Sequence, residues 1–377
     1  MKKVMTIVGT RPELIKLCLV LKELDAQTHH ILVHTGQNFD FELNEIFFQE
    51  LGIRKPDHFL QAAGKTPIET IASVLVKIDQ LLEQERPDAV LIYGDTNSCL
   101  ASIAVKRRKI PLFHMEAGNR CFDQRVPEEI NRKMVDHLSD INMPLTEHGR
   151  RYLLNEGLPP QTVLKTGSCM FEILKHFESE IANSTVLSSL GLNSRQFFVL
   201  SAHREENVDR PDKLSHLAQA LNRLAQDYGH QIVFSVHPRT RKRIDALNTI
   251  KLDPKIIESK PLGFFDYIRL QREALCVISD SGTLSEESAI LGFPAVHIRD
   301  AYERPEGMEA GGFVLSQIDP VGLLQSVKIA ISHDPRHQTN YQNPVADYQI
   351  DGVSKTVVKI ILSHIEYVQQ TVWRKAG

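Results

Sequence analysis

The sequence predicts an α/β fold of two doubly wound domains with parallel sheets that face each other across a cleft. Short apolar runs alternate many times with amphipathic stretches, which is typical of strand–helix units. Each run is almost wholly apolar, as expected for a parallel strand that is covered on both faces. The alternation breaks once, around residues 168–196, and then resumes. With 377 residues, the chain is long enough for two such domains.

The first series of elements fills the first domain, which we place at residues 1–170. The strands expected from apolar, β-branched runs are Val4–Val8, Ile31–His34, Ala89–Tyr93, Ile110–His114 and Ile141–Met143. The helices expected between them are Pro12–Leu24, Pro67–Gln84 and Glu128–Leu138. A proline near the first helical position suits a helix start, because its missing N–H would be unpaired there in any case.

The second series predicts the second domain, which we place at residues 171–377, after a polar stretch over 175–189. Its expected strands are Phe197–Ser201, Ile232–Val236, Leu275–Ser279 and Ala295–Ile298, and its expected helices include Lys213–Tyr228 and Ser285–Leu291. The chain closes with a helical stretch, Val353–Trp373, which could return to pack on the first domain.

Composition and charge are those of an ordinary globular protein. The chain is 42% hydrophobic and 24% charged, with a formal net charge of −3. This balance gives no support for a nucleic acid or a membrane as partner. The one dense basic run, residues 106–109, is interpreted as a solvated helix end.

Cysteine usage and the N-terminal sequence indicate the compartment. The five cysteines are scattered, without a CxxC pair or zinc-like spacing to histidine, which favours a reducing compartment and no metal. The N-terminal apolar stretch is too short for a signal peptide, and no apolar run approaches the roughly 20 residues of a membrane span. We therefore expect a cytoplasmic protein.

The first domain carries polar residues where its strands end. The first strand runs into Gly9–Glu13, which contains Arg11, and Lys16 lies one turn into the helix. The helix start and these two cations predict an anion site. An ordinary strand–helix turn is the alternative. The third strand ends at Asp95, which either points into the cleft or caps the next helix. His114 and Glu116 follow on one face of the fourth strand.

A further acidic pair, Glu128 and Glu129, follows Pro127 at the start of a helix. The helix dipole favours acids at that position, and this explains at least one of the two glutamates without a functional role.

The second domain shows the same concentration of polar strand ends. His203 and His237 follow its first two strands, and Asp280-Ser281-Gly282-Thr283 follows the third. A Ser-Gly-Thr turn that opens a helix presents amides and hydroxyls to a phosphate, and a glutamate one turn later can accept from ribose hydroxyls. Arg299 and the segment 303–306 follow the last strand.

So many charged strand ends indicate an active site, because buried charges are costly unless they are paired or used. Groups that can donate hydrogen bonds to a phosphate lie beside carboxylates that can accept from hydroxyls. This combination indicates an anionic ligand that bears a sugar. The sequence contains neither a Walker lysine motif nor a dinucleotide fingerprint nor a metal cluster. The chemistry is therefore expected to come from side chains, without a cofactor or metal.

At these residues the chain resembles the bacterial non-hydrolysing UDP-N-acetylglucosamine 2-epimerases over nearly its whole length. The motifs occur in the family's order and read GTRPE (9–13), GDT (94–96), EAG (116–118), PEE-x-NR (127–132), HRE (203–205), DSG-x-x-x-EE (280–287) and ERPE (303–306). The resemblance implies two Rossmann-like domains in the GT-B arrangement. It also implies inversion at carbon 2 of a UDP-amino sugar, by elimination of UDP to a 2-acetamidoglycal followed by re-addition.

The resemblance assigns the site residues. Those that match the family's catalytic groups are Asp95, Glu116, Glu128 and His203. Those that match its nucleotide and sugar contacts are Arg11, Lys16, Arg132, His237, Ser281, Gly282, Glu287 and Arg304. Family resemblance also favours a homodimer.

The segment between EAG and PEE departs from the UDP-N-acetylglucosamine enzymes. It spans residues 119–126, is about two residues shorter and lies beside the sugar in the family. The form HMEAGNRCFDQRVPEE resembles the branch that makes UDP-N-acetyl-L-fucosamine from UDP-2-acetamido-2,6-dideoxy-L-talose, for capsule or O-antigen synthesis. The alternatives are the UDP-N-acetylglucosamine/UDP-N-acetylmannosamine reaction and the conversion of UDP-N-acetyl-L-rhamnosamine to UDP-N-acetyl-L-quinovosamine.

Three other functions are alternatives to that of a non-hydrolysing epimerase. A GT-B glycosyltransferase shares the expected fold but has no need of this carboxylate set. A hydrolysing epimerase would release UDP. A silent nucleotide-sugar sensor would have no need of Asp95, Glu116, Glu128 and His203.

Overall fold

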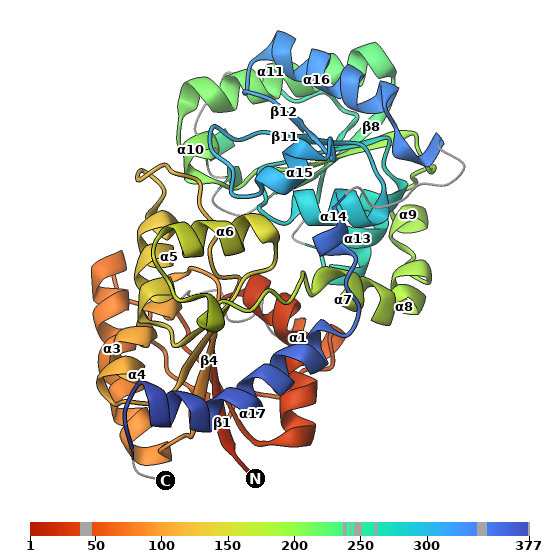
Figure 1. Ribbon diagram of the computed structural model, residues 1–377. Coiled ribbons are helices and arrows are strands. Elements are labelled where there is room, and N and C mark those ends of the chain that lie inside the picture. The colour runs from red at the N-terminus through yellow and green to blue at the C-terminus, as the bar shows by residue number, and fades with distance from the viewer. Residues whose placement is uncertain are drawn as a thin grey trace. The chain divides into compact units, whose positions relative to one another are not determined.

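The computed structural model describes residues 1–37, 47–236, 240, 241, 243, 244, 251–259, 262–337 and 345–375. The chain divides into two compact units, Met1–Ile173 with Asp347–Gly377, and Leu174–Ala346. Each unit is built on a six-stranded parallel sheet with helices packed against it (Figure 1). The predicted fold class, two parallel α/β domains, is confirmed.

The first unit contains most of the expected elements of the first series. Its strands are β1 (Lys3–Val8), β2 (His29–His34), β3 (His58–Phe59), β4 (Ala89–Tyr93), β5 (Leu112–Met115) and β6 (Ile141–Met143). Its helices are α1 (Arg11–Gln27), α3 (Pro67–Glu85), α4 (Ser102–Arg107), α5 (Pro127–Leu138), α6 (Glu147–Asn155) and α17 (Val353–Thr371), with 3-10 turns η1 (Asn97–Ala101) and η2 (Pro160–Thr162). Helix α7 (Met170–His176) leads into the second unit.

The second unit repeats the plan. Its strands are β7 (Phe197–Ser201), β8 (Gln231–Ser235), β9 (Ile256–Ser259), β10 (Cys276–Ser279), β11 (Ala295–His297) and β12 (Val314–Leu315). Its helices are α8 (Glu178–Ala182), α9 (Val186–Ser189), α10 (Glu205–Val208), α11 (Pro211–Tyr228), α13 (Phe264–Glu273), α14 (Leu284–Leu291), α15 (Pro305–Glu309) and α16 (Pro320–Ser332), followed by the 3-10 turn η3 (Pro335–His337). The 3-10 turn η4 (Ala346–Tyr348) leads back into the first unit.

Both sheets have the same strand order. The first sheet runs β3-β2-β1-β4-β5-β6 and the second runs β12-β11-β10-β7-β8-β9. In each sheet the first strand of the unit lies in the middle, so β1 pairs with β2 and β4, and β7 pairs with β8 and β10. The chain therefore moves outward in opposite directions from the β1/β4 and β7/β10 pairs. In open α/β sheets, ligands bind outside the carboxyl ends of the strands at such switch points.

Burial on both faces explains why the strand sequences are continuously apolar. In β7, Phe198 and Leu200 pack in a cluster with residues of α11 and α16, whereas Phe197 and Val199 pack in a second cluster with residues of α13 and α14. Successive side chains of a strand point to opposite faces, so a sheet covered on both sides needs an apolar residue at every position.

The C-terminal helix belongs to the first unit, so the second unit ends at Ala346 and not at residue 377 as in the expected division. Helix α17 packs against α1 and buries Val357, Ile361 and Ile365. Ser354 at its start donates to Glu172, and Lys2 pairs with Glu366 near its end. Both ends of the chain thus lie on the first unit (Figure 1).

Three strands were not expected from the sequence, namely β3, β9 and β12. Each is an edge strand of two to four residues with partly exposed positions. An edge strand of this length carries too few buried residues to produce an apolar run, and it forms because a neighbouring strand offers free N–H and C=O groups.

We expect Ile361→Ala to lower the free energy of unfolding by about 2–5 kcal/mol, because this side chain is fully buried where α17 packs on the rest of the first unit. Urea unfolding followed by circular dichroism measures the change. Ile68→Ala is the control, since Ile68 is 73% exposed and its loss should alter stability by less than about 0.5 kcal/mol. Equal effects of the two substitutions would contradict the packing of α17.

Candidate active site

The end of β1 is joined to the end of β4 by one buried carboxylate. Glu13, in the first turn of α1, accepts from Gly9 N at 2.6 Å, from Thr10 Oγ1 at 3.1 Å and from Thr96 Oγ1 at 2.7 Å. Burial raises the pKa of Glu13 to about 7, although these three donors oppose the shift. The Glu13 carboxyl group therefore fixes the two strand ends at the switch point of the first sheet.

Gly9 is required at this point by close packing. A Cβ atom there would meet Ser98 Oγ at 2.0 Å and Thr35 Oγ1 at 2.6 Å. Those two hydroxyls are hydrogen-bonded to each other at 2.7 Å, and Gln37 Oε1 accepts from Ser98 N and Oγ. This close contact places the turn after β1 directly against the first residues of η1.

The two cations predicted for the anion site lie on the first two turns of α1. Lys16 is buried, at 2% exposure, whereas Arg11 is exposed. The Arg11 guanidinium carbon lies 5.1 Å from the centroid of the Phe47 ring. These two side chains and the amides of the helix start lie at the carboxyl edge of the sheet. The anion site at this edge stays a prediction.

Asp95, after β4, is held by Arg132 from α5. Arg132 Nε donates to Asp95 Oδ2 at 2.7 Å, and Asn131 Nδ2 donates to the Asp95 backbone oxygen at 2.9 Å. The alternative role of Asp95 as a helix cap is wrong, because Thr96 is the residue whose side chain caps η1. Arg132, predicted as a ligand contact, here orients the Asp95 carboxylate.

Glu116 lies beyond the end of β5, so the expectation that it shares a strand face with His114 is wrong. β5 ends at Met115, and Glu116 adopts a left-handed backbone conformation with φ of 65°. Such a conformation costs about 1–2 kcal/mol for a residue with a side chain, so surrounding contacts must hold it. Glu116 Oε1 accepts from Asn119 Nδ2 at 3.1 Å.

The two glutamates that open α5 have different environments. Glu129 is fully buried and accepts from Cys121 N at 3.0 Å and Phe122 N at 3.2 Å, so it holds the preceding loop. Glu128, the predicted catalytic residue, is only half-buried. Both glutamates lie in the first turn of α5, and Glu129 has in addition a structural role in holding the loop, which the sequence did not reveal.

In the second unit, His203 after β7 is paired with Asp280 after β10. His203 Nδ1 lies 3.0 Å from Asp280 Oδ1, and Asp280 also accepts from the backbone N–H groups of His203 and Arg204. Burial acts to raise the pKa of Asp280, but the charge and hydrogen bond of His203 outweigh it and lower that pKa to about 2. An ionised Asp280 can only accept, so Nδ1 carries the hydrogen in this contact and Nε2 lies at the other end of the ring.

The turn after β10 has the form predicted for a phosphate site. Ser281 Oγ lies 3.0 Å from Thr283 Oγ1, and Ser281 N donates to Ser279 Oγ at 3.0 Å. A Cβ at Gly282 would meet no atom within 4 Å, so the turn is open at that point. Its amides and hydroxyls precede α14, whose N-terminus favours anions.

The remaining predicted residues of this unit are buried beside α14. Glu287 accepts from Gln271 Nε2 at 2.7 Å, and Arg304 Nη2 lies 3.1 Å from Glu286 Oε1. His237 lies outside the described residues. The structure thus groups His203, Ser281 and Gly282 at the β7/β10 switch point, with Glu287 on α14 and Arg304 directly before α15.

Sequence reasoning missed Asp136 and Arg120. Asp136 lies seven residues after Glu129 on α5, and Arg120 lies inside the loop after EAG. Both are fully buried and paired with each other at 2.7 Å. A charged residue at heptad spacing from Glu129 could have indicated Asp136, but the sequence gives no signal of its partner.

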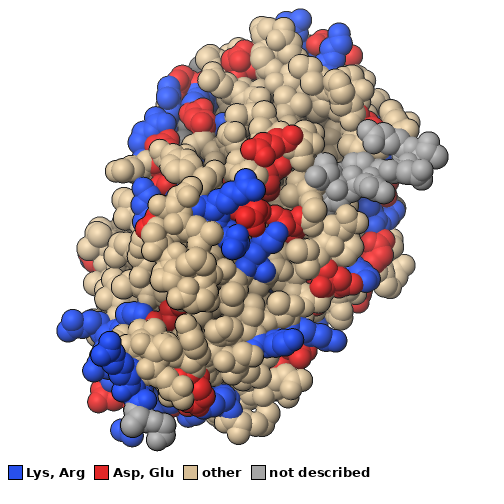
Figure 2. All heavy atoms as spheres, in the orientation of Figure 1, with Lys and Arg blue, Asp and Glu red and all other residues tan. Residues whose placement is uncertain are grey.

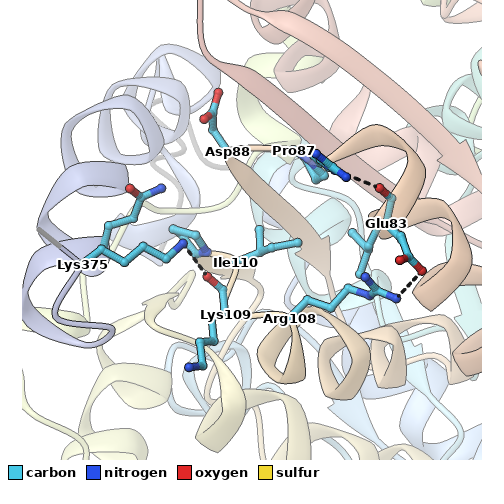
Figure 3. Close-up of a pocket in the computed structure, with 11 residues that line it drawn as sticks. Glu83, Pro87, Asp88, Arg108, Lys109, Ile110 and Lys375 are labelled. Carbon is cyan, nitrogen blue, oxygen red and sulfur yellow. Dashed lines mark hydrogen bonds and ion pairs between the residues drawn. The ribbon is translucent and has the colours of Figure 1, made fainter. Parts of the chain in front are cut away.

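The cavity in Figure 3 lies away from these residues. It has a volume of about 370 Å³ and is lined in part by Asp88, Ile110 and Pro111, which directly precede strands. It therefore lies at the amino edge of the first sheet. Lys375 Nζ reaches the Lys109 backbone oxygen there at 3.3 Å. This end of a parallel sheet is opposite to the one where such folds bind ligands.

On the face in Figure 2, basic and acidic side chains lie interspersed in small groups. No helix within the described ranges is long and apolar enough to cross a membrane. Among those same ranges, no group of three or more His, Cys, Asp or Glu side chains could hold a metal ion.

Comparison with known proteins identifies the family. The family model described as UDP-N-acetylglucosamine 2-epimerase matches residues 22–362. The chain belongs to this family. It is an epimerase, and the relatives below support that activity.

The epimerase is similar to proteins from bacteria and archaea. A UDP-N-acetylglucosamine 2-epimerase structure from Rickettsia bellii covers 100% of both chains at 51% identity with a TM-score of 0.92. The Methanocaldococcus jannaschii enzyme in complex with UDP-GlcNAc and UDP is 30% identical, covers 96% of this chain and 99% of its own, and has a TM-score of 0.87. These likenesses confirm the GT-B-like pair of Rossmann-like domains.

A third relative is named for a different sugar. The UDP-2,3-diacetamido-2,3-dideoxy-D-glucuronate 2-epimerase of Pseudomonas aeruginosa is 38% identical over 319 residues, 83% of this chain and 88% of its own. Members of the family are thus named for more than one UDP-sugar.

We expect the stability of the epimerase to fall as pH rises through the pKa of Glu13. The folded-state pKa of about 7 lies above the ordinary value of 4.5, so the stabilisation is complete below pH 4.5 and is lost as pH rises through 7. The full loss amounts to about 3 kcal/mol. Glu13→Gln keeps an acceptor but does not titrate, so urea unfolding at pH 5 and pH 8 should show a smaller decrease for this variant.

Glu83→Gln is the control for Glu13→Gln, because the Glu83 side chain is 71% exposed and should leave the pH dependence unchanged. Identical pH slopes for the wild type and Glu13→Gln would show that Glu13 does not titrate in this range.

Proposed function

We propose that the protein inverts carbon 2 of a UDP-2-acetamido sugar, and specifically that it converts UDP-2-acetamido-2,6-dideoxy-L-talose into UDP-N-acetyl-L-fucosamine. The observation that carries the proposal is the pair of carboxylates at adjacent strand ends, Asp95 held by Arg132 and Glu116 in its left-handed turn. Family membership supports the reaction type, and the loop over residues 119–126 supports the choice of sugar.

Elimination and re-addition explain why carboxylates are needed. The hydrogen on carbon 2 is not adjacent to a carbonyl, so its direct removal is unfavourable. In the proposed reaction a carboxylate takes this proton while the bond between carbon 1 and UDP breaks, giving a 2-acetamidoglycal and UDP. A second group then returns a proton to the opposite face of carbon 2 as UDP adds back. Asp95, Glu116 and Glu128 are the proposed acids and bases.

The second unit is proposed to hold the departing UDP. Ser281 and Gly282 would offer amides and hydroxyls to the diphosphate, and Glu287 would accept from the ribose hydroxyls. His203, whose Nδ1 is held by Asp280, would present its Nε2 to the substrate. Arg11, Lys16, His237 and Arg304 are the other proposed contacts, and cations among them would stabilise the charge that develops on UDP.

The loop between Glu116 and Pro127 is the proposed determinant of the sugar. Two buried carboxylates hold it, Glu129 through Cys121 N and Asp136 through Gly118 N. A 6-deoxy sugar lacks one hydroxyl, and a site fitted to that loss rejects the hydroxylated analogue strongly when a polar group would be left unpaired. The UDP-N-acetylglucosamine and UDP-N-acetyl-L-rhamnosamine reactions are the alternatives.

The proposal places the enzyme in the cytoplasm as a homodimer, supplying capsule or O-antigen synthesis.

Proton NMR in deuterated water tests the substrate. The protein is incubated separately with UDP-N-acetylglucosamine and with UDP-2-acetamido-2,6-dideoxy-L-talose. We expect deuterium at carbon 2 of the talose compound, together with its fucose epimer, and no exchange on the glucose compound. Exchange on UDP-N-acetylglucosamine alone would keep the mechanism and refute the assignment of the 119–126 loop. Net release of free UDP and sugar would instead indicate a hydrolysing enzyme.

We expect Asp95→Asn and Glu116→Gln each to lower turnover by about 100- to 10,000-fold while UDP still binds, because the lost group acts mainly in the transition state. Turnover is measured by the same NMR assay and UDP binding by calorimetry. Asp79→Asn is the matched carboxylate control, since Asp79 pairs with Arg108 on the surface. Near-wild-type turnover in either variant would remove that residue from the reaction.

A further inference from the structure

One face of α5 carries three buried charged residues. Glu129, Arg132 and Asp136 are spaced at i, i+3 and i+7, which places them on one side of a helix, and each is at most 5% exposed. Burying charges is unfavourable unless each is paired and hydrogen-bonded. Glu129 holds the backbone of the loop, and Arg132 holds the Asp95 carboxylate, as described above. Asp136 has a separate set of partners.

Asp136 is a fully buried carboxylate surrounded by donors. Arg120 Nη1 donates to Oδ2 at 2.7 Å, His114 Nδ1 lies 2.9 Å from Oδ1, and Gly118 N lies 3.2 Å from Oδ2. Burial acts to raise the pKa of Asp136, but His114 and Arg120 outweigh it, and the pKa is lowered. The side chain is therefore ionised and accepts every one of these hydrogen bonds.

His114 must then carry a proton on both ring nitrogens. Its Nδ1 faces the ionised Asp136, and its Nε2 lies 2.9 Å from the Gly94 backbone oxygen. Neither of these oxygens can donate, so each ring nitrogen has to. Burial acts to lower the pKa of His114, but Asp136 and the Gly94 oxygen raise it overall. The histidine thus links Asp136 to the residue that directly precedes Asp95.

Arg120 makes the second connection, from Asp136 to the loop. Its guanidinium is fully buried and donates to the Asn119 backbone oxygen at 2.7 Å as well as to Asp136. Its other side forms a two-point pair with Glu156 at the end of α6, at 2.8 and 2.7 Å. Since Asn119 and Arg120 lie within four residues of Glu116, the Arg120 side chain fixes the backbone that turns away from β5.

We propose that Asp136 is a positioning residue for the reaction at carbon 2. Through His114 and the Gly94 oxygen it fixes the end of β4, where Asp95 lies, and through Gly118 N and Arg120 it fixes the turn that holds Glu116. One side chain on α5 thereby sets the separation of two carboxylates from different strands. The inference rests on the proposed function only in taking Asp95 and Glu116 as the reacting carboxylates.

Asp136→Asn tests the proposal. The amide places an NH₂ group where His114, Gly118 or Arg120 now donates, and it removes the negative charge between two cations. We expect kcat to fall about 10- to 100-fold, since small displacements of reacting groups have effects of this size. KM should stay within about two-fold, because the Asp136 side chain is fully buried and out of reach of a ligand. The assay uses whichever UDP-sugar the wild-type protein epimerises.

Asp140→Asn is the matched control. Asp140 is also a buried aspartate in the same unit, and it accepts from Leu112 N at 2.9 Å and pairs with Lys106. It therefore supports the amino end of β5, whereas Asp136 supports the residues after its carboxyl end. We expect Asp140→Asn to lower the melting temperature but to keep the wild-type kcat. Equal losses of kcat in both variants, or a wild-type kcat in Asp136→Asn, would overturn the proposal.

A second set of variants keeps the proposal testable if Asp136→Asn does not fold. His114→Gln places an amide NH₂ near the Nε2 position and retains the contact with Gly94, and His114→Asn retains a donor toward Asp136 but loses Gly94. Arg120→Lys keeps the charge but cannot bridge Asp136 and Glu156 together. We expect reduced kcat with unchanged KM in all three, and wild-type kcat in all three would refute the linkage.

The outcomes separate this proposal from the proposed function. Turnover of UDP-N-acetylglucosamine in place of the talose compound would refute the substrate, but the comparison of Asp136→Asn with Asp140→Asn would still stand. If Glu116→Gln and Asp95→Asn kept their turnover while Asp136→Asn lost it, the catalytic assignment would be wrong, and Asp136 would not act through those carboxylates.

Discussion

The structure depends on one constraint, which is that helices cover both faces of each parallel sheet. A strand in this environment has no face toward water, so nearly every position in it is apolar, as in β4 and in Phe197–Leu200 of β7. The polar side chains proposed for the site, such as Asp95 and His203, lie instead on residues that follow the strands. Because parallel strands all end at the same edge, these residues gather in one place in each unit, and the switch points at β1/β4 and β7/β10 leave room there for a ligand.

Charges gathered in this way must be held apart and oriented, and the chain uses buried partners for this. Glu13 joins two strand ends, Arg132 orients Asp95, and Asp280 orients His203. Each of these contacts joins an element to a neighbour distant in sequence. Glu13 and Arg132 sit on helices and Asp280 directly follows a strand, whereas Asp95 and His203 sit on turns. A group on a turn can be held to the accuracy that catalysis needs only if the scaffold supports it in this way.

Helix α5 has the central part in the first unit. Its first turn brings Glu128 and Glu129 to the strand ends, and its buried face reaches both Asp95 and the loop after β5. The loop between Glu116 and Pro127 is tied to the helix at two places. In our proposal the exposed part of this loop sets the choice of sugar, while the buried ties hold Asp95 and Glu116 in position.

The sequence by itself determined the fold class, most of the strands and the polar residues that follow them. These features are local, since an apolar run and the residue after it can be recognised without knowing what lies nearby. Only the tertiary structure decided which charges pair, as when Arg132 proved to hold Asp95 and Asp136 proved to link His114 with Arg120. It also decided the edge strands β3, β9 and β12 and the return of α17 to the first unit. Pairing of this kind depends on distances between segments far apart in the chain, and those distances are set by packing and not by any local pattern of residues.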